Sequence, residues 1–441
     1  MIEFDNIIIG AGPGGYELAA ILAARSENTA IVESGHLGGT CLNRGCIPTK
    51  CLCASAAALM SVTHAQDFGV DATINGFDYS VAASRKDKVV DQLRQGVKGV
   101  LKDCTILNGT ARLHADRVVE VNGELYKASR RLVIATGSKP ALLQIKGAEL
   151  AITSDEALAL TELPESITII GGGVIGMEFA SIYSAMGVTT NVIEYCAEIL
   201  PPFDPEIAKR LRTTLSRRGV NICVGAKVEH ICRDNATGKL TVTYTGKKGQ
   251  TSVESSTVLM AVGRTPVVPD GCSKAGIKLS PRGFIEVDDL MCTSAEGVYA
   301  IGDVNGLSML AHSAIAQGRV VADNDATLFN RAAIPSVVFA YPEVAQTGMT
   351  PAELQQLGIP FKSEKRPYAS NGKACAEGYE GILKVLYTDD AVKTVVGVSI
   401  LGPHAADLIA EATMLVTDRV TLNDVDARYI HAHPTLSELF C

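Results

Sequence analysis

The sequence has no tryptophan, few aromatic residues and no excess of positive charge. Aromatic side chains make up 5% of its 441 residues, and 48 acidic residues outnumber 40 basic ones, for a net charge of −8. This acidic balance argues against a nucleic-acid partner. The first apolar strand begins almost at Met1 without a basic and apolar leader, and we expect no apolar run of membrane-spanning length. We therefore expect a soluble, cytoplasmic protein with no membrane anchor.

Cysteine is plentiful, but it is not spaced as in a metal site. The 12 cysteines are dispersed over a chain that is 47% hydrophobic and long enough for about three domains. Cys51 and Cys53 lie in an Ala/Leu/Cys stretch that we expect to be helical, where cysteine behaves as a small hydrophobic residue. Eight others have no partner at ligand spacing: Cys104, Cys196, Cys223, Cys232, Cys272, Cys292, Cys375 and Cys441. No metal site is predicted.

A complete dinucleotide-binding pattern opens the chain. An apolar strand at 7–9 runs into a glycine-rich turn at 10–15, a helix is expected to about residue 25, and a second strand at 30–32 ends at Glu33. A carboxylate at this offset is placed to accept hydrogen bonds from a ribose hydroxyl. The full strand-turn-helix-strand-acid order predicts nucleotide binding, whereas the glycines alone would indicate only a tight turn.

The same pattern recurs in the middle of the chain. A strand at 167–170 precedes the turn 171–176, a helix is expected from 177 to 186, and the next strand ends at Glu194. In both turns the first glycine allows the tight turn, the second lets the backbone approach a pyrophosphate and the last lets helix and strand pack closely. One chain is therefore predicted to carry two dinucleotide sites.

Cys41 and Cys46 differ from the other cysteines because they follow directly after the first dinucleotide unit. They are five positions apart on what we expect to be the first turns of a helix, so they can approach closely enough to form a disulfide. A positive helix end or a nearby base lowers the pKa of a thiol, and the thiolate is the reactive form. In thiol–disulfide exchange one sulfur faces the substrate and the other resolves the mixed disulfide. The pair is predicted to be a redox centre beside a bound cofactor.

A late apolar strand ends in Gly302-Asp303, and Met309 to His312 open a helix of small residues. With the motifs above, this pattern resembles the class I flavoprotein pyridine nucleotide-disulfide oxidoreductases and, within them, the dihydrolipoamide dehydrogenases. The resemblance spans nearly the whole chain. The stretches that carry it are 42–48, 135–138, 263–266, 340–345, 401–405 and 431–438.

The resemblance implies an α/β fold with two Rossmann-like dinucleotide-binding domains and a C-terminal α+β dimerisation domain. The expected FAD-binding domain spans 1–148 and the expected NAD-binding domain spans 149–268. A central segment, 269–332, would complete the FAD site, and the interface domain would occupy 333–441.

The resemblance also assigns the first fingerprint to FAD and the second to NAD. Asp303 would bind the ribityl chain of FAD. Glu194 would accept a hydrogen bond from the 2′-hydroxyl of NAD and repel a 2′-phosphate. The implied FAD residues are Gly10, Gly12, Gly14, Gly15, Glu33, Thr40, Lys50, Thr136, Gly137, Asp303, Met309, Leu310, Ala311 and His312. The implied NAD residues are Gly171, Gly173, Val174, Ile175, Gly176, Glu194 and Gly263.

The resemblance gives the two cysteines separate roles. Cys41 would be the interchange thiol that meets the substrate, and Cys46 would lie against the flavin as the electron donor. Lys50 and Glu178 would form an ion pair beside the reactive edge of the flavin. Pairing is physically reasonable because a lone buried charge is costly.

The expected base lies near the C-terminus. Oxidation of a dithiol requires proton removal, and histidine, with a pKa of ~6.5, suits that role near neutral pH. By resemblance His433 is this base and Glu438 fixes its tautomer. His431 is a second, lower-ranked candidate, while His312 and His404 are expected to be packing or cofactor-adjacent residues.

The activity expected from the resemblance is oxidation of dihydrolipoamide with reduction of NAD, which would contribute to cell redox homeostasis. One alternative is another NAD(P)H-dependent disulfide or metal reductase, similar to glutathione or mercuric reductase. Glu194 disfavours the former, and the lack of a C-terminal pair of adjacent cysteines disfavours the latter. A second alternative is a role mainly as a docking subunit. The expected partners are a second copy of the chain and the lipoyl-bearing E2 core of a 2-oxoacid dehydrogenase complex or a glycine-cleavage H protein.

Overall fold

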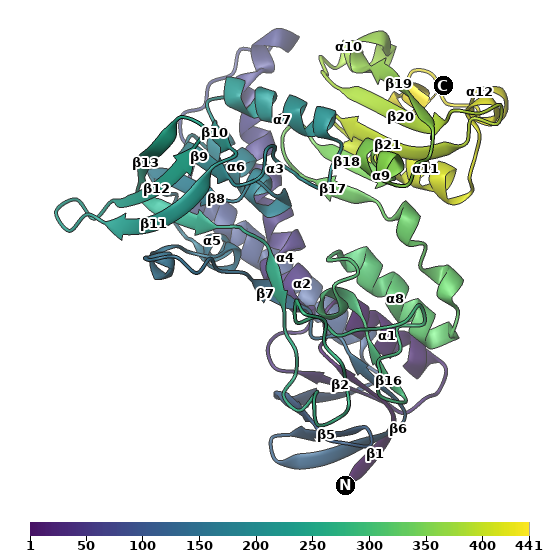
Figure 1. Ribbon diagram of the computed structural model, residues 1–441. Coiled ribbons are helices and arrows are strands. Elements are labelled where there is room, and N and C mark those ends of the chain that lie inside the picture. Colours follow the sequence, from purple (N-terminus) through teal and green to yellow (C-terminus); the bar gives the residue numbers. More distant parts are fainter. Residues whose placement is uncertain (441) are drawn as a thin grey trace.

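The N-terminal sheet collects strands from distant parts of the chain (Figure 1). The computed structural model describes residues 1–440. The strand order is β3-β2-β1-β6-β5-β4, and β16 adds to β6. β1 runs parallel to β2 and β6, and β16 runs parallel to β6. The strands are β1 Ile2–Ile9, β2 Thr29–Glu33, β3 Thr105–Asn108, β4 Ala111–Leu113, β5 Val118–Val121, β6 Glu124–Ile134 and β16 Val298–Ala300.

The centre of this sheet is buried on both faces. Ile7 and Ile8 point to opposite faces of β1, and both are 0% exposed. Such a continuous apolar run is typical of a central parallel strand. Helix α1 (Pro13–Ala24) covers the sheet and packs along α8 (Ala311–Asp323), so the central segment of the chain returns to the N-terminal unit.

The second unit repeats the first on a smaller scale. Its parallel sheet has the order β10-β9-β8-β14, and an antiparallel sheet, β11-β12-β13, lies beside it. Its elements are β8 Ser166–Ile170, α6 Val174–Ala185, β9 Thr189–Glu194, α7 Pro205–Arg217, β10 Asn221–Val224, β11 Lys227–Arg233, β12 Leu240–Gly246, β13 Gly249–Ser255 and β14 Thr257–Met260. The short strands β7 (Ser138–Pro140) and β15 (Arg264–Pro266) pair antiparallel where the chain enters and leaves this unit.

The redox segment spans two helices rather than one. Helix α2 (Gly39–Arg44) ends at Gly45, whose φ of −148° and ψ of −113° interrupt the helix, and α3 (Cys46–Thr63) begins directly after it. The expectation of a single helix carrying both cysteines is therefore wrong. α3 packs against α4 (Tyr79–Val100) and α6, so it joins the two dinucleotide units. The short helix α5 (Ser154–Ala159) lies against α2.

The expectation that no apolar stretch reaches membrane-spanning length is also wrong. Gly39–Thr63 has an 18-residue window with a mean hydropathy of 1.4, of which 28% is buried. It is the one segment within residues 1–440 that is long and apolar enough to span a membrane. The same stretch carries Lys50 in an ion pair with Glu178 of α6. Because core helices of soluble proteins meet the same criteria, its composition is weak evidence for a membrane span.

The C-terminal unit is a separate α+β layer, drawn in light green and yellow in Figure 1. Its antiparallel sheet has the order β17-β18-β21-β20-β19. Helix α11 packs against this sheet through a core that includes Leu383, Ile400 and Leu408. Its elements are β17 Ser336–Val338, β18 Val344–Gly348, α9 Pro351–Gln356, β19 Phe361–Pro367, α10 Gly372–Ala376, β20 Ile382–Thr388, β21 Val395–Leu401, α11 Ala405–Thr417 and α12 Leu422–Arg428.

The predicted fold class is confirmed: two parallel-sheet units, each with its glycine-rich turn before a helix, precede an α+β unit.

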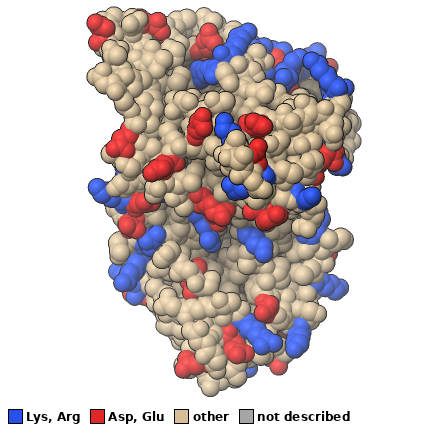
Figure 2. Space-filling view, turned by 90° about the vertical axis from the view of Figure 1, so that its left-hand side faces the viewer, with Lys and Arg blue, Asp and Glu red and all other residues tan. Residues whose placement is uncertain are grey.

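Figure 2 shows acidic and basic side chains interspersed over the face that it presents.

Candidate active site

The first glycine-rich turn leaves room for a ligand at one position and is closed at the others. Gly10 has a φ of +107°, and a Cβ there would lie 2.3 Å from the Ala135 carbonyl oxygen. A Cβ on Gly15 would lie 1.9 Å from the Gly10 oxygen, whereas on Gly12 it would meet nothing closer than Gly39 Cα at 4.0 Å. No side chain caps α1. Its N-terminal amides and the open Gly12 backbone therefore fit a pyrophosphate.

The second turn repeats this geometry. Gly171 has a φ of +110°, and a Cβ there would lie 2.4 Å from the Ala261 oxygen. A Cβ on Gly176 would lie 1.9 Å from the Gly171 oxygen, whereas on Gly173 it would meet nothing within 4 Å. The N-terminus of α6, where Val174 and Ile175 lie, also has no side-chain cap. The chain thus has two glycine-rich turns, each with an open backbone position at an uncapped helix N-terminus, as a dinucleotide pyrophosphate needs.

Each turn is tied to the acid at the end of the following strand. Glu33 accepts hydrogen bonds from Ala11 N and Gly35 N, both at 2.8 Å. Glu194 accepts them from Gly172 N and Cys196 N, both at 2.5 Å. A carboxylate has about four acceptor positions. Both side chains are therefore fixed while acceptor capacity is left for ribose hydroxyls.

Asp303 lies in a polar network that sequence reasoning missed. It belongs to the 3-10 turn η3 (Gly302–Asn305), and its Oδ2 accepts a hydrogen bond from Ser138 Oγ. Arg264 Nε donates to Ser138 Oγ at 2.6 Å and lies 3.8 Å from Asp303 Oδ2. Burial lowers the pKa of Arg264, while Asp303 opposes that shift. The signals in the sequence were the stretches 135–138 and 263–266, which contain Ser138 and Arg264.

Gln317 holds the backbone that presents Asp303. Its Oε1 accepts hydrogen bonds from Gly302 N at 2.7 Å and Asn305 Nδ2 at 2.9 Å. Its Nε2 is buried and has no protein partner. A buried donor without a partner is costly, so this donor beside the Asp303 turn fits a site built for a polar ligand.

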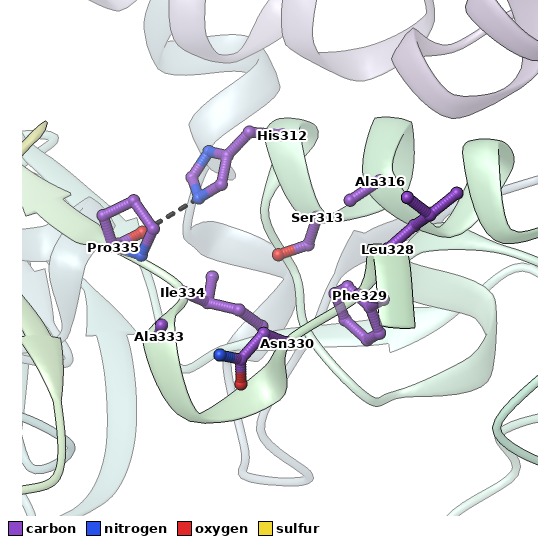
Figure 3. Close-up of a pocket in the computed structure, with 9 residues that line it drawn as sticks. All are labelled: His312, Ser313, Ala316, Leu328, Phe329, Asn330, Ala333, Ile334 and Pro335. Atoms are coloured by element: carbon purple, nitrogen blue, oxygen red, sulfur yellow. Dashed lines mark hydrogen bonds between the residues drawn. The ribbon is translucent and has the colours of Figure 1, made fainter. Parts of the chain in front are cut away.

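Met309 to His312 lead into the N-terminus of α8, where a small cavity lies (Figure 3). The cavity has a volume of about 170 Å³. The ring of His312 points toward Pro335 at one side of the cavity, and its Nε2 lies 2.9 Å from the Pro335 carbonyl oxygen (Figure 3). Burial lowers the pKa of His312. The imidazole of His312 therefore forms its hydrogen bond with the segment that leads into the C-terminal unit. The lining residues are His312, Ser313, Ala316, Leu328, Phe329, Asn330, Ala333, Ile334 and Pro335.

Cys41 and Cys46 are both free thiols, and they differ in acidity. A hydrogen bond from Cys41 lowers the pKa of Cys46 to about 7; burial opposes this shift and the charge of Lys50 adds to it. The same hydrogen bond raises the pKa of Cys41, and burial raises it further. The interaction between the two thiols therefore favours ionisation of Cys46 over ionisation of Cys41.

Lys50 and Glu178 form a partly buried ion pair where α3 and α6 meet. Lys50 Nζ lies 3.0 Å from Glu178 Oε1, and the two side chains are 31% and 8% exposed. Phe339, from the segment after β17, donates its backbone N–H to the same oxygen at 3.0 Å. The aromatic ring of Phe339 also lies under the ammonium group, 4.0 Å from Nζ. The pair was expected from the sequence; the contact with Phe339 was not.

His433 and Glu438 form the histidine–carboxylate pair that the sequence suggested. His433 Nδ1 lies 2.8 Å from Glu438 Oε1, and Thr435 N donates to Glu438 Oε2 at 2.9 Å. These two bonds, the backbone bond first, lower the pKa of Glu438. The His433 side chain is 80% exposed, which leaves its Nε2 accessible. His431 bonds Glu411 of α11 at 2.6 Å instead.

The remaining candidates are not brought together. His433 and Glu438 make their side-chain hydrogen bonds within the 431–438 segment, and Figure 1 places the C-terminal unit and α2 in different parts of the molecule. Cys53 and Cys51 lie on α3, and no group of three metal-ligating side chains occurs in the described part of the chain. Cys441 lies outside the described residues.

Comparisons with known proteins agree with this geometry. The family model described as pyridine nucleotide-disulphide oxidoreductase matches residues 4–318, and the dimerisation-domain model of the same family matches residues 334–441. A protein of Thermus scotoductus named dihydrolipoyl dehydrogenase is 40% identical over 99% of this chain and 96% of its own length. The protein of that name from Chlamydia muridarum is 37% identical over 99% and 95%.

A solved structure shares the whole fold. The flavoprotein disulfide reductase RclA from Escherichia coli, described as HOCl-induced, superposes with a TM-score of 0.86 and 27% sequence identity over 99% of this chain and 98% of that one. Its Cu(II) complex superposes with a TM-score of 0.87.

Proposed function

The chain belongs to the pyridine nucleotide-disulphide oxidoreductase family, and from that membership we propose that Cys41 and Cys46 carry out dihydrolipoamide oxidation. The chain is an FAD- and NAD-dependent oxidoreductase that acts on sulfur groups, like its relatives named dihydrolipoyl dehydrogenase. The observation that carries the assignment of residues is the placement of Cys41 and Cys46 on consecutive helices beside the Lys50–Glu178 ion pair, because exchange needs two neighbouring sulfurs, one that is attacked and one that leaves. The lowered pKa of Cys46 agrees with its role as the leaving sulfur.

The proposed exchange begins from a Cys41–Cys46 disulfide. His433 takes the proton of one dihydrolipoamide thiol and releases it to solvent, and the resulting thiolate attacks the sulfur of Cys41. A substrate–Cys41 bond forms, the Cys41–Cys46 bond breaks and Cys46 leaves as a thiolate. His433 accepts the proton of the second substrate thiol, which attacks the substrate sulfur of the mixed disulfide. Lipoamide closes and Cys41 leaves. Two electrons remain on the cysteines. His433 returns the second substrate proton to Cys41, and the first has already left to solvent.

The surrounding residues hold this chemistry in place. Glu438 keeps the proton of His433 on Nδ1 and so leaves Nε2 to act as the base. The first glycine turn, Glu33 and Asp303 are proposed to bind FAD, and the second turn and Glu194 to bind NAD. Bound FAD would supply the acceptor for the two electrons held by the dithiol, and bound NAD would supply the final hydride acceptor. The domain limits proposed from the sequence, 1–148, 149–268, 269–332 and 333–441, follow these roles.

The family dimerisation domain occupies the C-terminal unit, and the enzyme is a homodimer. We propose that the two chains share each active site, with His433 of one chain serving the cysteines of the other. The separation of the C-terminal unit from α2 within one chain supports this arrangement. We further propose a cytoplasmic enzyme that serves the lipoyl-bearing E2 core of a 2-oxoacid dehydrogenase complex or a glycine-cleavage H protein.

A second candidate function is reduction of another disulfide or of a metal ion, because the fold is shared with RclA, whose structure was solved as a Cu(II) complex. RclA is 27% identical to this chain, whereas relatives named dihydrolipoyl dehydrogenase are 37% and 40% identical, so this candidate has less support. A role mainly as a docking subunit would leave free dihydrolipoamide without turnover.

Steady-state assays separate these functions. With NAD as the acceptor, we expect kcat/KM for free dihydrolipoamide to exceed the values for NADH-dependent reduction of glutathione disulfide or Cu(II) by about 100-fold or more. Cys41→Ser should abolish the activity, and Cys232→Ser, at an exposed cysteine of β11, should not. Equal or higher efficiency with glutathione disulfide or Cu(II) would favour the second function, and no turnover of free dihydrolipoamide would favour docking alone.

A further inference from the structure

The segment between β17 and β18 leaves the C-terminal sheet and lies against the ion pair of the other units. β17, from the C-terminal unit, is in contact with α6 of the second unit. The Phe339 backbone N–H donates to Glu178 Oε1 at 3.0 Å, and its carbonyl oxygen accepts a hydrogen bond from Cys53 Sγ at 3.4 Å. The aromatic ring of Phe339 faces Lys50, whose Nζ lies 4.0 Å from the ring centroid. One residue of the C-terminal unit thus touches both members of the ion pair.

The backbone of this segment is anchored independently of the ring. Tyr341 N donates to Ser181 Oγ at 2.8 Å, one turn after Glu178 on α6. Arg218, at the end of α7, donates to the Tyr341 carbonyl oxygen at 2.5 Å, and its guanidinium lies 4.6 Å from the Tyr341 ring. Because main-chain groups make most of these contacts, a change of the Phe339 side chain leaves the docking of the segment intact.

The ring limits where the Lys50 charge can lie. The ammonium group has three N–H donors, of which one direction is taken by Glu178 at 3.0 Å. The face of the ring attracts the cation and excludes water from a second side. Lys50 lies one helical turn after Cys46 on α3, so its position decides how closely positive charge faces that sulfur.

We propose that Phe339 is a positioning residue whose ring holds the Lys50 ammonium against Glu178, so that the C-terminal unit sets the charge facing Cys46. The proposal rests on the proposed function, because it gives Cys46 the role of the thiolate. The charged or titratable groups that face Cys46 are Cys41 of α2, Lys50 of α3, Glu178 of α6 and Arg264 of β15. Of these, Lys50 alone contacts an aromatic ring.

The test compares ring removal with ring retention. In holoenzyme reduced by two electrons, the long-wavelength thiolate-to-flavin absorbance band reports ionised Cys46. At pH 7 we expect Phe339→Leu and Phe339→Met to weaken this band about twofold or more and to move its titration to higher pH. Phe339→Tyr should keep the wild-type band. Phe361→Leu, on β19 of the same unit, is the matched control and should also keep it.

Lys50→Met makes the test decisive. If Lys50→Met weakens the band while neither ring-removing variant does, Phe339 has no positioning role. The same conclusion follows if Phe361→Leu weakens the band as much as Phe339→Leu, because the effect would then be general destabilisation. A wild-type enzyme that shows the band and responds to Phe339→Leu but does not turn over dihydrolipoamide would retain the positioning role and contradict the proposed function.

Discussion

Cys41 and Cys46 lie on consecutive helices that are separated only by Gly45, and a hydrogen bond between their sulfur groups makes Cys46 the more acidic of the two. The break at Gly45 turns two residues five positions apart into facing neighbours. A Cβ on Gly45 would lie 3.0 Å from the Thr40 carbonyl oxygen, so the close approach depends on glycine. The asymmetry of the pair leads to separate predictions for each sulfur.

The first prediction assigns the absorbance band to one sulfur. Partial reduction of the holoenzyme should give a long-wavelength thiolate-to-flavin band that Cys46→Ser abolishes and Cys41→Ser retains, because Cys46 is the charged sulfur. Absorbance spectra under anaerobic titration measure this directly. Loss of the band in Cys41→Ser with retention in Cys46→Ser would mean that the two roles are reversed.

The second prediction concerns pH. The pKa of Cys46 is lowered to about 7, so its thiolate is present above that value and is lost as the pH falls through it. The band should therefore fade on acidification with a midpoint near neutrality. An unperturbed thiol would lose it at a higher pH, near ~8.5. A midpoint at that higher value would show that Cys41 and Lys50 do not stabilise the thiolate.

The third prediction concerns the nicotinamide cofactor. Glu194 is buried and fixed by two backbone donors, so it cannot turn away from a 2′-phosphate. NAD should be used better than NADP by about 100-fold or more in kcat/KM, since like-charge juxtaposition costs several kcal/mol. Glu194→Gln should lower the ratio of kcat/KM for NAD to kcat/KM for NADP, because it removes the negative charge that repels the 2′-phosphate. Comparable values for the two cofactors in the unmodified enzyme would refute this role of Glu194.

The fourth prediction tests the shared site. Cys41→Ser and His433→Gln are each expected to be inactive, but a mixed dimer would hold one site with both residues intact and one with neither. Verified mixed dimers should therefore recover about half of the wild-type activity per dimer. Tandem-tagged heterodimers, purified on both tags, provide the measurement. If they stay inactive, each site draws both residues from its own chain.

Local patterns in the sequence predicted the parts of the site that local segments build. The two strand-turn-helix units and their terminal acids, Glu33 and Glu194, follow from glycine and apolar spacing within short stretches. The resemblance to the family supplied pairs that no local pattern gives. Lys50 and Glu178 are 128 positions apart, and the structure places them in contact.

Contacts between distant segments explain what the sequence did not predict. Phe339 meets Lys50 only because β17 returns to α6, and Arg264 meets Asp303 only because β15 pairs with β7 beside the η3 turn. The helix break at Gly45 was also missed, since glycine inside an apolar stretch is compatible with one kinked helix or with two. The same apolar stretch, Gly39–Thr63, has the length and hydropathy of a membrane-spanning helix. Composition alone does not distinguish such a helix from a buried helix of a soluble protein.

The measurement that tests the central claim most directly identifies which cysteines become free thiols when dihydrolipoamide reduces the enzyme. Oxidised enzyme is treated anaerobically with dihydrolipoamide without NAD, alkylated, and mapped by peptide mass. We expect Cys41 and Cys46 to change from protected to alkylated in a one-to-one ratio with lipoamide formed, while Cys232 and Cys375, which are exposed, are alkylated equally before and after. If lipoamide is formed while Cys41 and Cys46 are alkylated to the same extent in both samples, the two cysteines are not the redox centre of this enzyme.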